Sequence, residues 1–436
     1  MSERRVAPVA HVDGAVTVPG DKSISHRALL LGAVARGRSY VGNCSPAADV
    51  ESTMRCLRDC GAWVRPFGRG RVVLDGSGPG ESLRAPADVL DCGNSGTTMR
   101  LLTGVLAGHD IAATLDGDAS LRGRPMERVA EPLRAMGADV VTSAGGTAPL
   151  RVTGRRELRA VDWTTPVASA QVKSAILLAA LNADRATTVT EPHPTRDHTE
   201  RLLRMCGIAV HVEGTRVTGL PGTPAPFGFH VPGDISAAAF FLALGAARRG
   251  WRMRCASVGL NPGRTGIIDV LRAMGAAVDV EAGAAAGGVE PQGDVEVRGT
   301  ALRAVIVAGA LTVRCIDEIP VICVLATQAE GTTEIRDAGE LRRKESDRIA
   351  GIAAGLRALG ARCEVSADGI AVSGPTPLRA TALDSLGDHR LAMAWGVAAA
   401  LSGPEGSPLP IQGAEAAAVS YPGFFDELDR VASGAG

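Results

Sequence analysis

The stretch VPGDKSISHRALLLGAVARG, residues 18–37, returns without a gap as VPGDISAAAFFLALGAARRG, residues 231–250. In both copies Pro-Gly predicts a turn, and the aspartate or serine that follows is a typical cap for the helix after it. The two copies differ at Lys22 and Arg27, which are replaced by apolar residues in the second copy. The shared residues therefore indicate a scaffold. The two cations beside one helix start indicate anion binding, which helix N-termini already favour.

The chain also contains a second, shorter repeat, in which Leu-Arg-x-x-Gly is followed by a β-like stretch. It predicts a helix end, a glycine in the left-handed conformation after it, and then a strand. With a degenerate unit near 424–428, it indicates six supersecondary units of about 70 residues each. The five clear copies are residues 57–61, 133–137, 203–207, 271–275 and 356–360.

The VPGD repeat groups these units as three plus three and predicts two similar α/β halves. The turns at Gly20 and Gly233 are the expected cut points. We expect a first half-domain over 20–232 and a second over 1–19 plus 233–436. The first is inserted in the second if the N-terminal strand pairs with the C-terminal half.

Composition narrows the function classes. The chain has 436 residues, 45% of them hydrophobic, with a net charge of −1 and only 3% aromatics. A net charge this small gives no overall electrostatic attraction for nucleic acid or acidic membranes, and few aromatic side chains are available to stack on bases. No uninterrupted apolar stretch is long enough to span a membrane, and the N-terminus lacks the apolar core of a signal peptide. Nine scattered cysteines without a CxxC pair indicate reduced thiols and a cytoplasmic protein.

Cations and hydroxyls recur at predicted helix and loop starts, and two carboxylates, Asp317 and Glu345, stand beside apolar helices. Taken singly, each charge is equally typical of a solvated turn. Together they suit a substrate with several negative charges, on which the carboxylates exchange protons. His193 and His198 have no third ligand at a suitable spacing, so we expect no metal. The cationic segments are 21–27, 93–100, 122–128, 169–173, 195–201, 342–348 and 388–390.

Nine motifs of the chain resemble, in order, those of the 5-enolpyruvylshikimate-3-phosphate synthase family, in its second bacterial class. They are DKSISHR (21–27), GNSGTTMR (93–100), RPMER (124–128), SAQVK (169–173), TRDHTE (195–200), NPGRTG (261–266), IDEIP (316–320), KESDR (344–348) and DHR (388–390).

The resemblance implies a two-domain inside-out α/β barrel of six βαβαββ repeats, three per domain. It also implies transfer of the carboxyvinyl group of phosphoenolpyruvate to the 5-hydroxyl of shikimate 3-phosphate, through a tetrahedral intermediate. This is the sixth step of the shikimate route to aromatic amino acids, and the family is the target of glyphosate. The partners expected are the two small-molecule substrates, with no cofactor, no metal, no nucleic acid and no membrane, in a cytoplasmic monomer.

Residue roles follow from the resemblance, motif by motif. It makes Lys22, Asp317 and Glu345 catalytic. Shikimate 3-phosphate is expected at Lys22, Ser23, Arg27, Ser169, Ala170, Gln171, Arg196, Asp317 and Lys344. Phosphoenolpyruvate is expected at Lys22, Asn94, Gly96, Arg124, Gln171, Arg348 and Arg390. Arginine suits such sites because its planar fork binds phosphate or carboxylate bidentately.

Two departures and two alternatives accompany this interpretation. A lysine that many members carry near the C-terminus is absent from residues 418–422, and Thr195 stands where a serine is usual. The related UDP-N-acetylglucosamine enolpyruvyl transferases have Lys-Asn in place of Lys22-Ser23, and a reactive cysteine in the loop that corresponds to 121–128, which has none here. A binding paralogue without activity is the other alternative.

Overall fold

The computed structural model describes residues 3–68, 70–402 and 408–433. It consists of two compact units. The first unit comprises residues 20–232 and 285–290, and the second comprises 1–19, 233–284 and 291–436. Residues 285–290 differ from the expectation, which placed them with the second half. The reason is packing: Glu290 forms a buried hydrogen bond with His198, and Gly287 lies against Met205 and Phe229.

Within the described residues, the first unit has three four-stranded sheets of one topology. In each sheet the first two strands are parallel and the remaining neighbours are antiparallel. The sheets are β14 (Gly228–His230), β3 (Arg36–Gly42), β5 (Val72–Ser77), β4 (Trp63–Pro66); β6 (Leu90–Asp91), β7 (Ala112–Asp116), β9 (Leu150–Thr153), β8 (Asp139–Val141); and β10 (Asp162–Thr164), β11 (Thr187–Thr190), β13 (Arg216–Gly219), β12 (Val210–Glu213).

The second unit repeats this topology, with three strands in its last sheet as far as the described residues go. Its N-terminal strands β2 and β1 pair with β15 and β23, so the chain begins in this unit and returns to it after the first. The sheets are β2 (Asp13–Val16), β15 (Arg252–Gly259), β17 (Gln292–Arg298), β16 (Ala277–Ala282); β18 (Ile306–Val307), β19 (Gly331–Ile335), β21 (Ile370–Gly374), β20 (Arg362–Val365); and β1 (Glu3–Val6), β23 (Leu409–Gln412), β22 (Leu383–Asp384).

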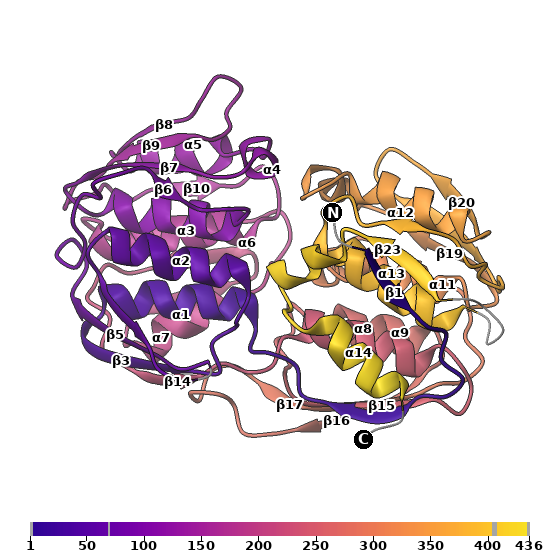
Figure 1. Cartoon of the computed structure of the whole chain (residues 1–436). Coiled ribbons are helices and arrows are strands. Elements are labelled where there is room, and N and C mark those ends of the chain that lie inside the picture. The colour runs from indigo at the N-terminus through magenta and orange to yellow at the C-terminus, as the bar shows by residue number, and fades with distance from the viewer. Residues whose placement is uncertain (1–2, 69, 403–407, 434–436) are drawn as a thin grey trace. The chain divides into compact units, whose positions relative to one another are not determined.

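Two kinds of helix pack against these sheets. Central helices are buried almost all round, as their nearly continuous apolar sequences require. They are α1 (Lys22–Val34), α3 (Gly96–Ala107), α6 (Ala170–Ala179), α8 (Ile235–Ala246), α11 (Ile319–Ala326) and α13 (His389–Leu401). Outer helices bury one face: α2 (Ala48–Asp59), α5 (Glu127–Ala135), α7 (His198–Met205), α9 (Gly266–Ala273), α12 (Arg348–Ala358) and α14 (Phe424–Ala432). Within the first unit, helices are stacked between sheets (Figure 1).

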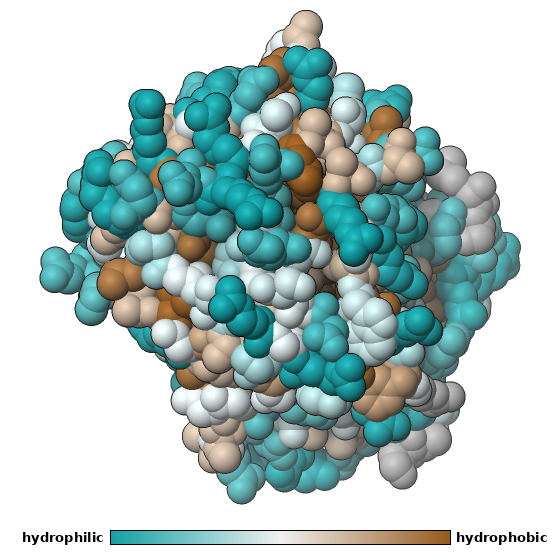
Figure 2. Space-filling view, turned by 90° about the vertical axis from the view of Figure 1, so that its left-hand side faces the viewer, coloured by the Kyte–Doolittle hydropathy of each residue, from teal (hydrophilic) through white to brown (hydrophobic). Residues whose placement is uncertain are grey.

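The shorter elements connect these layers. They are α4 (Ala119–Arg122), α10 (Ala310–Arg314), η1 (Ala180–Asn182), η2 (Gly339–Arg343) and η3 (Ala414–Val419). On the outer face of the first unit, hydrophilic side chains predominate and apolar ones are scattered (Figure 2). In the described parts of the chain, no helix is long and apolar enough to cross a membrane.

The Leu-Arg-x-x-Gly repeat forms the structure that it predicts. Its glycines have φ between +78° and +99°, and each follows the C-cap residue of α2, α5, α7, α9 or α12 and precedes β4, β8, β12, β16 or β20. The arginine of four copies also donates to the carbonyl oxygen six residues further on, which joins the helix end to the strand. The repeat is therefore a scaffold element. These arginines are Arg134, Arg204, Arg272 and Arg357.

The VPGD copies also form scaffold. Asp21 caps α1 by accepting from a backbone N–H at 2.8 Å, and Asp234 caps α8 in the same way. Gly20 is required by close approach, because a Cβ there would lie 1.7 Å from the carbonyl oxygen of Asn43. The caps are present in both copies, so Lys22 and Arg27 are not needed for them.

Candidate functional site

In the first unit, three central helices begin beside one another. Their caps are Asp21 for α1, Ser95 for α3 and Ser169 for α6. The first turns of α3 and α6 are joined by a hydrogen bond from Gln171 Nε2 to Thr97 Oγ1 at 2.9 Å. Each N-terminus presents unsatisfied N–H groups and a partial positive charge, so their convergence favours anions.

Two guanidinium groups lie near the start of α1. Arg27 is buried and donates to Thr199 Oγ1 at 2.8 Å and to Ser174 Oγ at 2.7 Å. Arg196 donates to Ser23 Oγ at 3.1 Å. Burial, together with the charge of Arg196, lowers the pKa of Arg27 from its ordinary value to about 10. Arg27 remains charged at neutral pH, and both cations are held in place before any ligand arrives.

Lys22, the third cation of this region, is paired with Asp49 of α2 at 2.9 Å. Both side chains are largely buried. Sequence reasoning missed Asp49, because the segment around it carries no motif. The pair fixes the ammonium group beside the N-terminus of α1.

A second cluster surrounds Gly96 at the start of α3. Arg124 donates to Asn94 Oδ1 at 2.5 Å, and Arg100 donates to Gln171 Oε1 at 2.5 Å. A Cβ at Gly96 would lie 2.9 Å from Nη1 of Arg100 and 3.4 Å from Nη1 of Arg124. The glycine therefore leaves room beside two guanidinium groups. Arg100 was not among the expected site residues, although its position one helical turn after Gly96 signals that it shares the same face.

In the second unit, Asp317 is surrounded by cations. Its carboxylate lies 3.1 Å from Arg264, 3.5 Å from Lys344 and 3.6 Å from Arg348. Its neighbour Glu318 is fully buried and accepts a hydrogen bond from Ser236. Burial raises the pKa of Glu318, although the nearby guanidinium of Arg264 opposes the shift. Arg264 comes from the NPGRTG motif and had no assigned role.

Arg348, at the start of α12, joins the other carboxylates of this unit. It contacts Asp388, the cap of α13, at 2.7 and 3.2 Å, and Glu345 at 2.5 Å. Burial alone would lower the pKa of Arg348, but the charges of Asp388 and Glu345 raise it above its ordinary value. Arg390 is also buried and donates to the backbone carbonyl of Ser236 at 3.3 Å.

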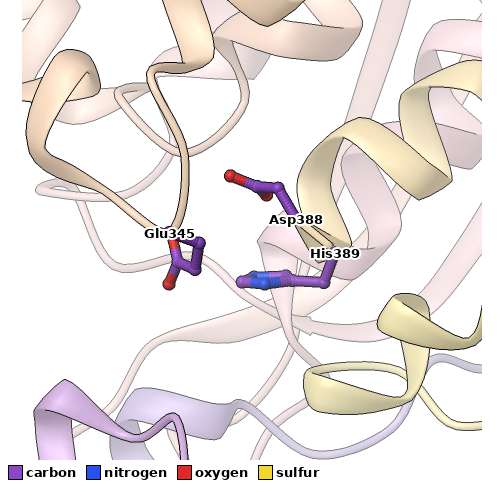
Figure 3. A group of neighbouring side chains, drawn as sticks. All are labelled: Glu345, Asp388 and His389. Carbon is purple, nitrogen blue, oxygen red and sulfur yellow. The ribbon is translucent and has the colours of Figure 1, made fainter. Parts of the chain in front are cut away.

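Glu345, Asp388 and His389 form the one group in the described residues with the spacing of a metal site (Figure 3). Both carboxylates already bind the guanidinium of Arg348. That buried cation supplies the positive charge that a metal ion would bring. We therefore interpret the group as an ion-pair network.

The expected site residues thus lie in local groups, in two different units. In the first unit Ser23, Arg27, Ala170 and Arg196 form one group, Asn94, Gly96, Arg124 and Gln171 form another, Ser169 caps α6, and Lys22 pairs with Asp49. In the second unit Asp317, Lys344, Glu345 and Arg348 form an ion-pair network, and Arg390 is linked to it through its backbone N–H, which donates to Asp388. The segment that lacks the expected lysine lies at the end of η3, around Val419.

The architecture has the fold of enolpyruvyl transferases. The enolpyruvyl transferase NikO from Streptomyces tendae is similar over 98% of this chain and 96% of its own, with a TM-score of 0.80 and 20% identity. The EPSP synthase of Acinetobacter baumannii is more similar, with a TM-score of 0.86, 40% identity and 98% coverage of both chains.

Sequence comparison gives the particular family. The family model for EPSP synthase (3-phosphoshikimate 1-carboxyvinyltransferase) matches residues 6–428. A 3-phosphoshikimate 1-carboxyvinyltransferase of Geobacillus kaustophilus is 51% identical over 96% of this chain and 98% of its own length. One of Anaeromyxobacter sp. (strain Fw109-5) is 49% identical over 99% and 98%. The chain belongs to the EPSP synthase family.

Proposed function

We propose that this chain transfers the carboxyvinyl group of phosphoenolpyruvate to the 5-hydroxyl of shikimate 3-phosphate and releases phosphate. The reaction is the sixth step of the shikimate pathway to aromatic amino acids. Membership of the family over nearly the whole chain supports this activity. The observation that carries it in the structure is the position of Asp317, a carboxylate held among three cations, one of which, Arg348, also pairs with Glu345.

The proposed chemistry is addition followed by elimination. Asp317 accepts the proton of the 5-hydroxyl, whose oxygen then attacks C2 of phosphoenolpyruvate. Glu345 gives a proton to the methylene carbon, which becomes a methyl group in the tetrahedral intermediate. In the second step Glu345 takes a proton back from that methyl group, the double bond re-forms, and phosphate leaves with the proton that Asp317 had accepted. Lys22 shares in proton transfer at the start of α1.

Anion binding is divided between the units in this proposal. The first unit presents the cation-rich wall for shikimate 3-phosphate, at Ser23, Arg27, Ser169, Ala170, Gln171 and Arg196. The second unit supplies Asp317 and Lys344 for the same substrate. Phosphoenolpyruvate is bound by Asn94, Gly96, Arg124 and Gln171 of the first unit and by Arg348 and Arg390 of the second. Arginine is effective here because a buried guanidinium stays charged and binds two oxygens at once.

We also propose that the enzyme works without a metal or an organic cofactor, as a cytoplasmic monomer. The guanidinium group of Arg348 stabilises Glu345 and Asp388, the two carboxylates that would otherwise call for a metal. Reduced thiols suit a cytoplasmic protein, and eight of the nine free cysteines are buried. A chelator is therefore expected to leave turnover unchanged.

The decisive experiment is phosphate release measured with phosphoenolpyruvate and either of two acceptors. Turnover with shikimate 3-phosphate is the expected result. Turnover with UDP-N-acetylglucosamine alone would refute the assignment of shikimate 3-phosphate as the acceptor. If a folded protein releases no phosphate with either acceptor, the chain is a binding paralogue and the enzymatic proposal fails.

A further inference from the structure

A lysine without an assigned role lies inside the first unit, between two glutamates. Lys173 Nζ, on α6, is 2.7 Å from Glu191 and 2.8 Å from Glu200, and the three side chains are 2%, 1% and 1% exposed. Burial by itself would lower the pKa of Lys173, but the two carboxylates raise it, so the lysine stays charged. Buried ion groups stabilise a fold poorly compared with apolar packing, which makes a specific role worth seeking.

Glu191 links this group to Arg196. The second carboxylate oxygen of Glu191 accepts a hydrogen bond from Thr195 Oγ1 at 2.7 Å. Thr195 directly precedes Arg196, whose guanidinium donates to Ser23 Oγ at 3.1 Å. The residues between β11 and α7 form no regular secondary structure, so side-chain hydrogen bonds contribute to holding them in place. Lys173, through Glu191 and Thr195, therefore anchors the segment that carries Arg196.

Glu200 links the same group to Arg27. Glu200 follows Thr199 in α7, and Thr199 Oγ1 accepts from Nε of Arg27 at 2.8 Å. The same hydroxyl is 2.7 Å from Ser174 Oγ, which also accepts from Nη2 of Arg27. Ser174 is the residue after Lys173 in α6. One buried lysine thus organises both guanidinium groups at the start of α1.

The charges explain why such a group is needed. Arg27 and Arg196 repel each other when they are held side by side, and the charge of Arg196 lowers the pKa of Arg27. Two glutamates and one lysine carry a net charge of −1, which offsets part of this repulsion at close range. The two guanidinium groups can then stand preorganised for a dianionic ligand without rearrangement on binding.

We propose that Lys173, Glu191, Glu200 and Thr195 form a positioning network that sets the geometry of Arg27 and Arg196 for the phosphorylated acceptor. The network acts on affinity for shikimate 3-phosphate and leaves affinity for phosphoenolpyruvate nearly unchanged. This inference rests on the proposed function, because the acceptor is the substrate assigned to these two arginines.

Thr195→Val tests the network, since it removes the hydroxyl and keeps the side-chain shape. We expect the KM for shikimate 3-phosphate to rise about tenfold, as loss of a hydrogen bond to a charged group implies. The KM for phosphoenolpyruvate and the melting temperature are expected to stay close to those of the wild type. Thr195→Ser restores the hydroxyl and is expected to restore the KM. Thr188→Val is the matched control, because its hydroxyl pairs with Thr218, outside the network.

The results separate this proposal from the function on which it rests. If the wild type releases no phosphate with shikimate 3-phosphate, the proposed function fails. If the wild type turns over and Thr195→Val leaves the KM for shikimate 3-phosphate within twofold, or raises both KM values equally, the network is overturned. Should the valine variant not fold, Glu191→Gln tests the same link, with the same selective rise expected and an equal rise in both KM values refuting it.

Discussion

Glu345→Gln separates proton transfer from binding in this protein. One Glu345 oxygen lies 2.5 Å from Nη2 of Arg348, and an amide oxygen can occupy the same place. Arg348 is held independently by two contacts to Asp388, at 2.7 and 3.2 Å, and is only 1% exposed. The substitution therefore keeps the size of the side chain and the position of Arg348. It removes a group that can donate and accept a proton at carbon.

The expected magnitude follows from this geometry. General acid–base catalysis contributes about 10²- to 10⁴-fold in rate. At about 1.36 kcal/mol per tenfold, the barrier rises by roughly 3–5 kcal/mol. Shikimate 3-phosphate is bound mainly by the first unit in our proposal, so its dissociation constant is expected to change by less than about threefold.

The assay combines initial rates of phosphate release with calorimetric titration of shikimate 3-phosphate. Glu364→Gln, the same change at an exposed position of β20, is the control and is expected to behave as the wild type. Equal losses of turnover and of shikimate 3-phosphate affinity would refute the role of Glu345 in proton transfer, as would a turnover within tenfold of the wild type.

Three further substitutions test the energetics. Lys173→Met leaves two buried carboxylates without their cation, so urea unfolding should show that the free energy of unfolding falls by about 3–5 kcal/mol. The control Arg156→Met breaks an exposed ion pair and should lower the free energy of unfolding by less than about 1 kcal/mol. Equal losses in the two variants would contradict the argument. Glu318 has a folded pKa raised above its ordinary value of 4.5, so its contribution to stability is present below that value and is lost as pH rises through the folded pKa. Glu318→Gln should therefore gain stability relative to the wild type as pH rises, and a difference that is constant between pH 4 and 8 would reject this. Gly96→Ala places a Cβ 2.9 Å from a guanidinium nitrogen and should raise the KM for phosphoenolpyruvate more than that for shikimate 3-phosphate. The control Gly228→Ala, whose Cβ would have no heavy atom within 4 Å, should change neither KM. Matching effects of the two alanine substitutions would disprove the steric reasoning.

Local features could be predicted from the sequence because their causes lie within one helical turn. The glycines of the Leu-Arg-x-x-Gly repeat have positive φ, and Asp21 and Asp234 cap their helices, because a cap or a left-handed glycine depends on neighbours a few residues away. The segment 285–290 could not be assigned in this way. Its partners, including His198 and Phe229, lie far from it in the sequence, and no local pattern encodes them.

The same distinction holds for the candidate site. The six units, their caps and the identity of the cations and carboxylates follow from the sequence, since each is a property of residue type and short spacing. Which of them lie in contact depends on the three-dimensional packing: Arg27 contacts Ser174 across 147 positions, Lys22 contacts Asp49, and Lys173 contacts its two glutamates. Such pairs depend on how buried helices pack against one another. That packing is set by the shape of the whole core, and no single segment of the chain contains it.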